Sequence, residues 1–163
     1  AASKKAFSDT ILYYHNALKI SCITLKLFDT YGPNDNRQKL LDLLKKHLKN
    51  NSNLQMSKGE QLLDLVHIKD VINAFLIAGE ILLSNKEPPI FKDYAITSGE
   101  LISLKDLSRY VANILDVDLN ITFGSRPYRK REVMTPWHTT KVLPNWKPAK
   151  KMKQSIKLFL LEN

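Results

Sequence analysis

Residues 22–35, CITLKLFDTYGPND, combine an apolar stretch with a turn, and this combination decides the fold that the sequence predicts. The first part, 22–28, is rich in β-branched and apolar residues, which is typical of a strand. The Tyr-Gly-Pro-Asn-Asp stretch that follows has the residues that favour turns. A second strand of the same character is expected at 93–98. Two buried strands separated by helices indicate an α/β fold.

Helical periodicity accounts for much of the remaining chain. The apolar residues recur at the three- and four-residue spacings of amphipathic helices. Asp70 is expected to cap one helix, and Ser103 with Asp106 resembles a capping box at the start of another. A short strand is expected at 120–124. The predicted helices span 2–18, 37–50, 70–83, 103–114 and 149–161.

Lys4 occupies an unusual position on the first predicted helix. At about 100° per residue it falls on the same side as the apolar stripe, whereas Lys5 points away. The stripe consists of Phe7, Ile11, Tyr14 and Leu18. The pattern therefore predicts a lysine on the inner face of this helix.

Composition limits the class of protein. The formal net charge is +9, but many of the lysines are interleaved with leucines on predicted helix faces, so we expect no nucleic-acid partner. The longest apolar run, 71–83, is shorter than the roughly 20 residues of a membrane span, and we expect a cytoplasmic protein without a membrane partner. The single cysteine, Cys22, favours neither a disulfide framework nor a metal site.

The sequence contains no self-sufficient catalytic motif. Five glycines in all leave little room for a phosphate-binding loop, and the motifs of serine hydrolases and zinc proteases are absent. The four histidines are scattered, and we expect them to have structural or surface roles; they are His15, His47, His67 and His138. Arg126, Arg129 and Arg131 cluster in one predicted loop, where their forked guanidinium groups suit phosphate.

Six motifs, taken in order, point to a family. They are SK at 3–4, LKLFDTYGPND at 25–35, GEQLLDLVHIKDVINAFLIA at 59–78, YAITSGELISLKDLSRYVANIL at 94–115, PYRKREVM at 127–134 and LPNWKP at 143–148. Together they resemble the C-terminal half of the extended short-chain dehydrogenase/reductases, the NAD-dependent epimerase/dehydratase family, in its nucleotide-sugar branch. The resemblance implies the last strands of a Rossmann-like parallel sheet plus a small mixed α/β substrate-binding lobe.

The resemblance also implies a division of the chain. Residues 1–35 would end the dinucleotide-binding domain, and 36–163 would form mainly the substrate-binding lobe, with 69–98 returning a helix and a strand to the main sheet. The family often dimerises, so a homodimeric parent protein is expected. Trp146 matches a tryptophan of the family that we expect in the core.

The resemblance assigns catalysis to a Tyr-x-x-x-Lys pair in which Lys4 is the lysine. Lys4 would hydrogen-bond the nicotinamide ribose of NAD or NADP and lower the pKa of the tyrosine, a general acid/base. The tyrosine would lie one residue before Ala1. We therefore interpret the chain as a fragment that alone neither binds NAD(P) tightly nor turns over. Phe28 would lie at the tip of the loop that passes the nicotinamide.

The expected substrate is a nucleotide-diphosphate sugar. Asp29 replaces the asparagine of the family and would bind a hydroxyl or a backbone N–H, or would shape the turn. Leu63 replaces an arginine that often holds the diphosphate. Arg129, with Arg126 nearby, would supply that contact, and Glu132 would hold the guanidinium group of Arg129 or a ribose hydroxyl.

The motifs favour, by resemblance, the sugar-nucleotide 4-ketoreductases that make dideoxyhexoses such as abequose or paratose. Sugar-nucleotide 4-epimerases and 4,6-dehydratases are the alternatives within the family. A different class remains open, in which the chain is a non-catalytic module whose basic surface binds a polyanion.

Overall fold

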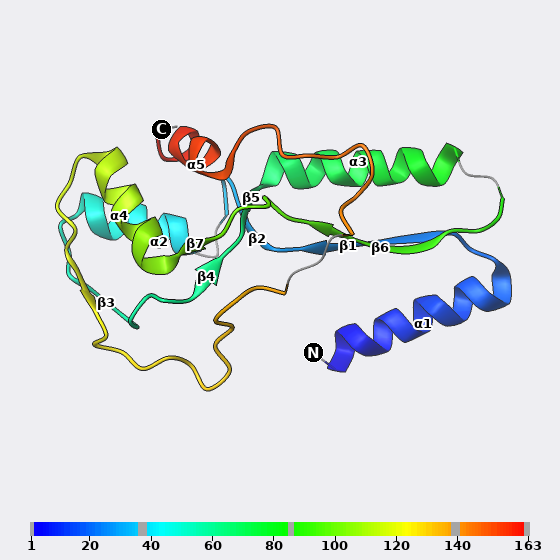
Figure 1. Cartoon of the computed structure of the whole chain (residues 1–163), viewed down its shortest axis with the longest axis horizontal. Helices are drawn as coiled ribbons and strands as arrows, with labels where there is room; N and C mark the ends of the chain where they lie inside the picture. Colours follow the sequence, from blue (N-terminus) through cyan, green and yellow to red (C-terminus); the bar gives the residue numbers. More distant parts are fainter. Residues whose placement is uncertain (1, 36–38, 85–86, 138–140, 162–163) are drawn as a thin grey trace.

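The computed structural model describes residues 2–35, 39–84, 87–137 and 141–161. Over these residues the chain alternates helices with short strands (Figure 1). The helices are α1 (Ala2–Leu18), α2 (Leu40–Lys49), α3 (Ile68–Ser84), α4 (Leu104–Leu115) and α5 (Met152–Leu161). The strands are β1 (Cys22–Leu27), β2 (Asp29–Tyr31), β3 (Leu54–Met56), β4 (Leu62–Leu63), β5 (Leu65–His67), β6 (Phe91–Ile96), β7 (Ile102–Ser103) and β8 (Ile121–Phe123).

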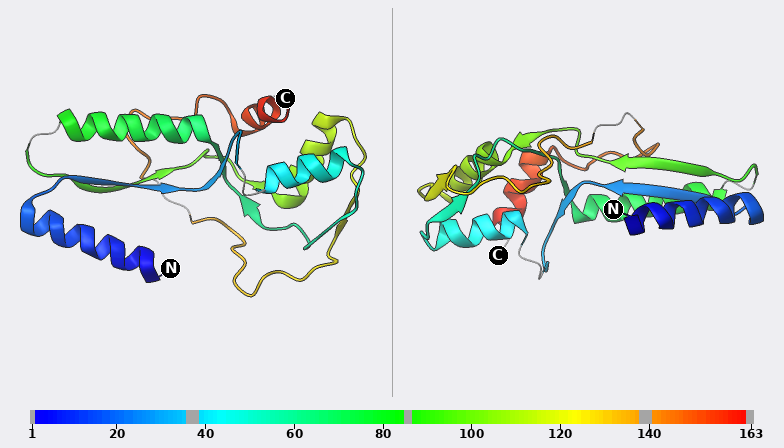
Figure 2. Two further views of the ribbon diagram at one scale, coloured as in Figure 1. Left: turned by 180° about the vertical axis from the view of Figure 1, so that it is seen from behind. Right: turned by 90° about the horizontal axis from the view of Figure 1, so that it is seen from below.

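The two strands predicted for the main sheet pair with each other. β1 and β6 run parallel, with Cys22 opposite Phe91 and Leu27 opposite Ile96. A further parallel bridge joins Ala95 to Val142. α3 and α1 lie on opposite sides of this pair (Figures 1 and 2). The parallel strands with helices on both sides confirm the predicted α/β class.

Three further strand pairs extend from this unit. β2 pairs in parallel with β5, and β3 pairs in parallel with β8. β4 pairs antiparallel with β7. This mixture of parallel and antiparallel pairs lies around α2, α4 and α5, at the other end of the molecule from α1 (Figure 1).

The apolar faces of the helices form two clusters of buried side chains. One cluster lies between α3 and the β1–β6 pair and includes Leu143 and Trp146. The other lies among α2, α4 and α5, where the leucines predicted for α2 meet those of α4. At the start of α4, the Ser103 hydroxyl accepts a hydrogen bond from Asp106 N at 3.0 Å and donates one to the Asp106 carboxylate at 2.7 Å. This confirms the capping interaction that was expected there.

The prediction for α1 is wrong in one respect. Phe7 is 66% exposed and Leu18 is 63% exposed, and no described residue of α1 is fully buried. The helix contacts the sheet along a narrower face than the predicted stripe. On this face the centres of the His15 and Phe91 rings lie 4.9 Å apart. Helical periodicity identifies the apolar side of a helix, but no described element covers the rest of that side. Lys4 is therefore exposed, although it shares a helix face with His15.

Two helix starts also differ from the prediction. α3 begins at Ile68, so Asp70 lies inside the first turn and does not cap the helix. Its carboxylate accepts the N–H of Ala149 at 3.0 Å, and α5 begins at Met152, three residues later than predicted. The indole of Trp146 donates to the Asp70 carbonyl at 2.9 Å and is buried, which confirms that this tryptophan belongs to the core.

The described helices include none that is both long and apolar enough to span a lipid bilayer.

Candidate functional site

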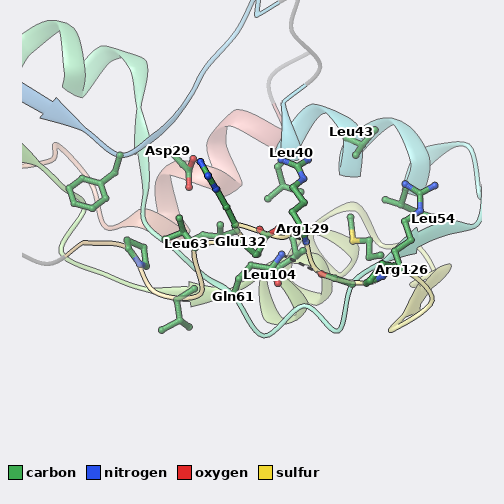
Figure 3. Close-up of a pocket in the computed structure, with 18 of the residues that line it drawn as sticks. Asp29, Leu40, Leu43, Leu54, Gln61, Leu63, Leu104, Arg126, Arg129 and Glu132 are labelled. Atoms are coloured by element: carbon green, nitrogen blue, oxygen red, sulfur yellow. Dashed lines mark hydrogen bonds between the residues drawn. The ribbon is translucent and has the colours of Figure 1, made fainter. Parts of the chain in front are cut away.

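A cavity of about 850 Å³ lies between α2, the segment 54–63 and the loop 125–137 (Figure 3). Its walls are apolar on the α2 side, where Leu40 and Leu43 face it, and on the opposite side, where Leu104 does so. Polar side chains converge on this apolar space, as is usual in small-molecule sites. These polar side chains are Asp29, Gln55, Ser57, Gln61, Arg126, Arg129, Arg131 and Glu132.

We call residues 125–134 the arginine loop. Backbone hydrogen bonds attach both of its ends to the segment opposite: Arg126 N donates to Met56 O at 3.2 Å, and Leu62 N donates to Met134 O at 2.8 Å. Between these ends, the Tyr128 hydroxyl donates to the Glu60 carboxylate at 3.0 Å. The loop therefore forms one wall of the cavity.

Three arginines of this loop line the cavity without carboxylate partners. Among the described residues, no acidic side chain lies within ion-pair distance of Arg126, Arg129 or Arg131. The Glu132 carboxylate instead accepts the backbone N–H of Arg129 at 3.4 Å, and Glu132 N donates to Arg129 O at 3.0 Å. The expected pairing of Glu132 with the Arg129 guanidinium is thus absent, because Glu132 closes a backbone turn. The cavity has an excess of positive charge that suits an anionic ligand.

Asp29 lies toward one end of the cavity, and Arg126 lies beside Leu54 at the other, with Arg129 and Glu132 between them (Figure 3). The backbone N–H of Asp29 donates to Asp64 O at 3.1 Å, which places Asp29 at the start of the β2–β5 pair. Burial raises the pKa of the Asp29 carboxyl, the charge of Asp64 raises it further, and Lys39 lowers it. The side chain nevertheless keeps an exposed surface toward the cavity.

A second cavity of about 580 Å³ adjoins the first. Phe28 and Asp29 line both cavities, so this dipeptide stands between them. The second cavity is also lined by Gly32, where an added Cβ would overlap the side chain of Ile68. Only glycine allows so close an approach of the loop to α3.

The structure brings together five of the six residues predicted for the site. Phe28, Asp29, Arg126, Arg129 and Glu132 all line the larger cavity. Lys4 lies on α1 and lines neither cavity. Leu63 lines both cavities as an apolar side chain.

Sequence reasoning missed several residues that line or support the larger cavity. Gln61 is 8% exposed, its Nε2 donates to Ser57 Oγ at 3.4 Å, and its Oε1 has no hydrogen-bond partner among the described residues. Trp137 lines the cavity and is 57% exposed, with Lys26 Nζ 5.3 Å from its ring centre. The arginine cluster and the PYRKREVM motif were the signals for this loop, and neither pointed to Gln61 or Trp137.

The described histidines have local partners. His15 Nδ1 lies 2.8 Å from Ile20 O, and His47 Nδ1 lies 2.8 Å from Ser52 Oγ. His67 is half-buried, and its Nδ1 accepts the N–H of Lys69 at 3.2 Å. His138 lies outside the described residues. The three described histidines therefore have the structural contacts that were predicted for them.

Comparison with known proteins identifies relatives of the chain. The model of the NAD dependent epimerase/dehydratase family matches residues 1–92. The chain is 31% identical to the CDP-abequose synthase of Salmonella typhimurium strain LT2, a match that covers 97% of this chain and 54% of that protein. It is also 31% identical to the CDP-abequose synthase of Yersinia pseudotuberculosis, over 77% of this chain and 43% of that protein. The chain thus spans about half the length of the curated relatives it matches.

Solved structures share the fold at lower identity. The UDP-N-acetylglucosamine 4-epimerase of Methanobrevibacter ruminantium M1, in complex with UDP-N-acetylmuramic acid, has a TM-score of 0.79 at 15% identity over 98% of this chain and 51% of its own. The dTDP-glucose 4,6-dehydratase DesIV of Streptomyces venezuelae, with NAD and TYD bound, has a TM-score of 0.80 at 16% identity over 98% of this chain and 48% of its own. These similarities confirm the Rossmann-like α/β fold.

Proposed function

The chain belongs to the NAD dependent epimerase/dehydratase family, and from this premise we propose that it forms part of an NAD(P)-dependent enzyme that acts on a nucleotide-diphosphate sugar. The observation that supports this most is the arginine loop. Three guanidinium groups without carboxylate partners among the described residues line one wall of a cavity that is apolar on the side of α2. A diphosphate supplies the missing negative charge, and each charge-assisted hydrogen bond to it would contribute about 1.5–3 kcal/mol when shielded from water.

The order of residues along the cavity suggests how the substrate lies. The nucleobase would occupy the end near Arg126, where Leu43, Leu54 and Met56 supply apolar surface. The diphosphate would lie beside Arg129 and Glu132, in the middle. The sugar would then reach Asp29, at the boundary with the second cavity. In this arrangement Asp29 accepts a hydrogen bond from a sugar hydroxyl, because an ionised carboxylate can only accept.

The residues present fit only part of a dinucleotide site. Phe28 lines both cavities and would contact the nicotinamide end of the cofactor, and Lys4 would donate to the ribose. The stretch between β1 and α3 contains no glycine-rich phosphate-binding motif. The bound cofactor supplies hydride-transfer chemistry. Lys4 would hold positive charge beside a tyrosine four positions before it, which lowers the pKa of that phenol.

We assign residues 1–35 to the end of the dinucleotide-binding domain and 36–163 mainly to the substrate-binding lobe. Residues 69–98 would return α3 and β6 to the main sheet beside β1. Most of the cofactor site would then lie in the other part of the enzyme, and the parent protein would be a homodimer in the cytoplasm.

Within the family we favour a 4-ketoreductase of a deoxyhexose pathway. Two relatives at 31% identity are CDP-abequose synthases, which suggests a CDP-linked sugar as substrate. A reductase consumes one NAD(P)H for each sugar, while the protein donates a proton to the ketone oxygen. A 4-epimerase or a 4,6-dehydratase, the alternatives, would return its cofactor to the starting state in each turnover.

The test uses the full-length enzyme that contains this chain. We expect it to oxidise one equivalent of NAD(P)H for each CDP-linked 4-keto sugar that it converts. Sugar conversion without net NAD(P)H oxidation would instead identify an epimerase or a dehydratase. No conversion of any nucleotide sugar, together with no binding of CDP, would contradict the proposal. The chain alone, mixed with NADH, should show no fluorescence transfer at micromolar concentrations.

A further inference from the structure

One side-chain contact joins the middle of the arginine loop to the turn 57–61, beside the cavity. Tyr128 OH donates to Glu60 Oε2 at 3.0 Å and accepts the backbone N–H of Glu60 at 3.2 Å. The hydroxyl thus acts as donor and acceptor toward the same residue. We call this double contact the Tyr128–Glu60 clasp.

The residue that the clasp holds on the far side belongs to a well-anchored turn. Gly59 O accepts the N–H of Lys105 at 2.9 Å, and Gln61 O accepts the N–H of Leu104 at 3.0 Å. Both donors are at the first turn of α4, so the turn 57–61 is fixed to the N-terminal end of a helix. Gly59 has a φ of 76°, and an added Cβ would lie 3.1 Å from Lys105 and from Phe123. Glu60 is therefore a rigid point of attachment.

The loop itself has few other attachments between its ends. Arg126 and Met134 are held by backbone hydrogen bonds, but the stretch 127–133 lies between them. Its internal turn, Arg129 to Glu132, fixes the local shape of the loop and not its distance from the opposite wall. Among the described residues, the clasp is the hydrogen-bonded link from this stretch to the turn 57–61.

Resting on the proposed function above, we propose that Tyr128 is a positioning residue for the diphosphate of the substrate: its clasp with Glu60 holds the neighbouring Arg129 at the cavity. Tyr128 directly precedes Arg129 in the chain, so a contact that fixes Tyr128 also fixes the backbone from which the Arg129 side chain extends. A long arginine side chain loses conformational entropy when it binds an anion. If its backbone is already fixed, less entropy is lost on binding.

The chemistry of the clasp requires a protonated tyrosine. Partial burial raises the pKa of the Tyr128 hydroxyl, and the Glu60 and Glu132 carboxylates raise it further, while the N–H of Glu60 lowers it. The phenol therefore stays a donor at neutral pH. Glu60, as an ionised carboxylate, accepts from it and makes a charge-assisted hydrogen bond.

The experiment measures the binding of CDP and of cytidine to the full-length enzyme by titration calorimetry. Tyr128→Phe keeps the ring and removes both contacts, and we expect the Kd for CDP to rise about 3- to 10-fold while the Kd for cytidine and the kcat change less than about twofold. Glu60→Ala removes only the carboxylate contact, because the backbone N–H of residue 60 remains, and should raise the Kd for CDP by a smaller factor; Glu60→Gln should have less effect still. Tyr110→Phe is the matched control, since it removes a hydroxyl that donates to Lys153 O at 2.8 Å, outside the cavity.

Arg129→Ala distinguishes this inference from the proposed function. In that background Tyr128→Phe should weaken CDP binding no further, because the residue that it positions is gone. If Arg129→Ala weakens CDP binding but Tyr128→Phe and Glu60→Ala do not, the clasp plays no positioning role. The same conclusion holds if Tyr128→Phe is equally harmful with and without Arg129. If Arg129→Ala leaves CDP binding unchanged, the diphosphate contact of the proposed function is wrong.

Discussion

The Asp64 carboxylate accepts two hydrogen bonds from Ser98, at 2.8 Å from its backbone N–H and at 2.6 Å from its hydroxyl. Asp64 follows β4, and Ser98 follows the end of β6, so the contact joins the region of the cavities to the β1–β6 pair. The Thr97 hydroxyl also donates to this carboxylate. Asp64 is only 3% exposed, and these three donors compensate for the burial of its charge.

Asp64→Ala should therefore lower the free energy of unfolding by about 1–3 kcal/mol, because half-buried donors of Thr97 and Ser98 lose their acceptor. Urea denaturation of the full-length protein would measure the loss. Asp93→Ala is the control: the Asp93 carboxylate pairs with Lys26 at 2.6 Å, but both side chains are 45% exposed, and such pairs contribute less than about 1 kcal/mol. Equal losses for the two variants would contradict the structural role of Asp64.

Arg129→Ala should raise the KM for the sugar nucleotide about 10- to 100-fold, since it removes a charge-assisted contact with the diphosphate. Steady-state kinetics of the full-length enzyme would show it. Arg109→Ala is the matched control, because that arginine pairs with Asp106 at 3.3 Å on α4 and lines neither cavity. An unchanged KM for Arg129→Ala would remove this arginine from the substrate site.

Lys4→Met should lower the kcat by at least about 100-fold, if its charge tunes a neighbouring tyrosine as proposed. Lys5→Met provides a control on the same helix, because Lys5 pairs with Asp9 at 2.5 Å and both side chains are largely exposed. The kcat of that variant should stay within about twofold of the wild type. A comparable kcat for the two variants would show that Lys4 is an ordinary surface lysine.

The strands and helices were largely predictable because their residues repeat with a regular period. The apolar stretches at 22–28 and 93–98 became the paired strands β1 and β6, and the leucines of α2 are buried where their spacing indicates. The first helix shows the limit of this reasoning. Its apolar stripe is real, but whether another element covers a stripe depends on contacts that no local pattern encodes.

The site was predictable only in part. Arg126 and Arg129 could be found because arginines clustered in a loop suggest phosphate binding. Gln61 and Tyr128 gave no such signal: one is a buried carboxamide in a turn, and the other contacts Glu60, 68 residues away in the chain. The role of such residues depends on long-range contacts, which only the folded structure reveals.

The KM for the sugar nucleotide should depend on pH through Asp29. Burial and the charge of Asp64 raise the pKa of this carboxyl, although Lys39 opposes the change. Below the raised pKa the group is neutral, and above it the carboxylate accepts the hydrogen bond from the sugar hydroxyl more strongly. We therefore expect the KM to decrease about 2- to 5-fold as the pH rises through that pKa, and Asp29→Asn to flatten this decrease. An identical pH profile for the variant would exclude Asp29 from the site.

Tyr31 should make the fold sensitive to alkaline pH. Its hydroxyl has no well-formed hydrogen bond among the described residues, although the Ser155 side chain lies close enough to lower the pKa. Burial dominates, and with Asp70 and Tyr110 it raises the pKa to about 12. Between pH 10 and 12 an unfolded tyrosine releases its proton while the folded one retains it, so the free energy of unfolding falls as the pH rises.

At about 1.4 kcal/mol for each pKa unit, this loss amounts to roughly 2 kcal/mol by pH 12. Tyr31→Phe should keep the stability at neutral pH to within about 1 kcal/mol and should lose less of it on titration to high pH, because it has no proton to release. Urea denaturation at several pH values would measure the free energy of unfolding of both proteins. Subtracting one value from the other at each pH removes the contribution of the other tyrosines. Parallel curves for wild type and variant would mean that Tyr31 ionises as readily in the folded protein as in the unfolded chain.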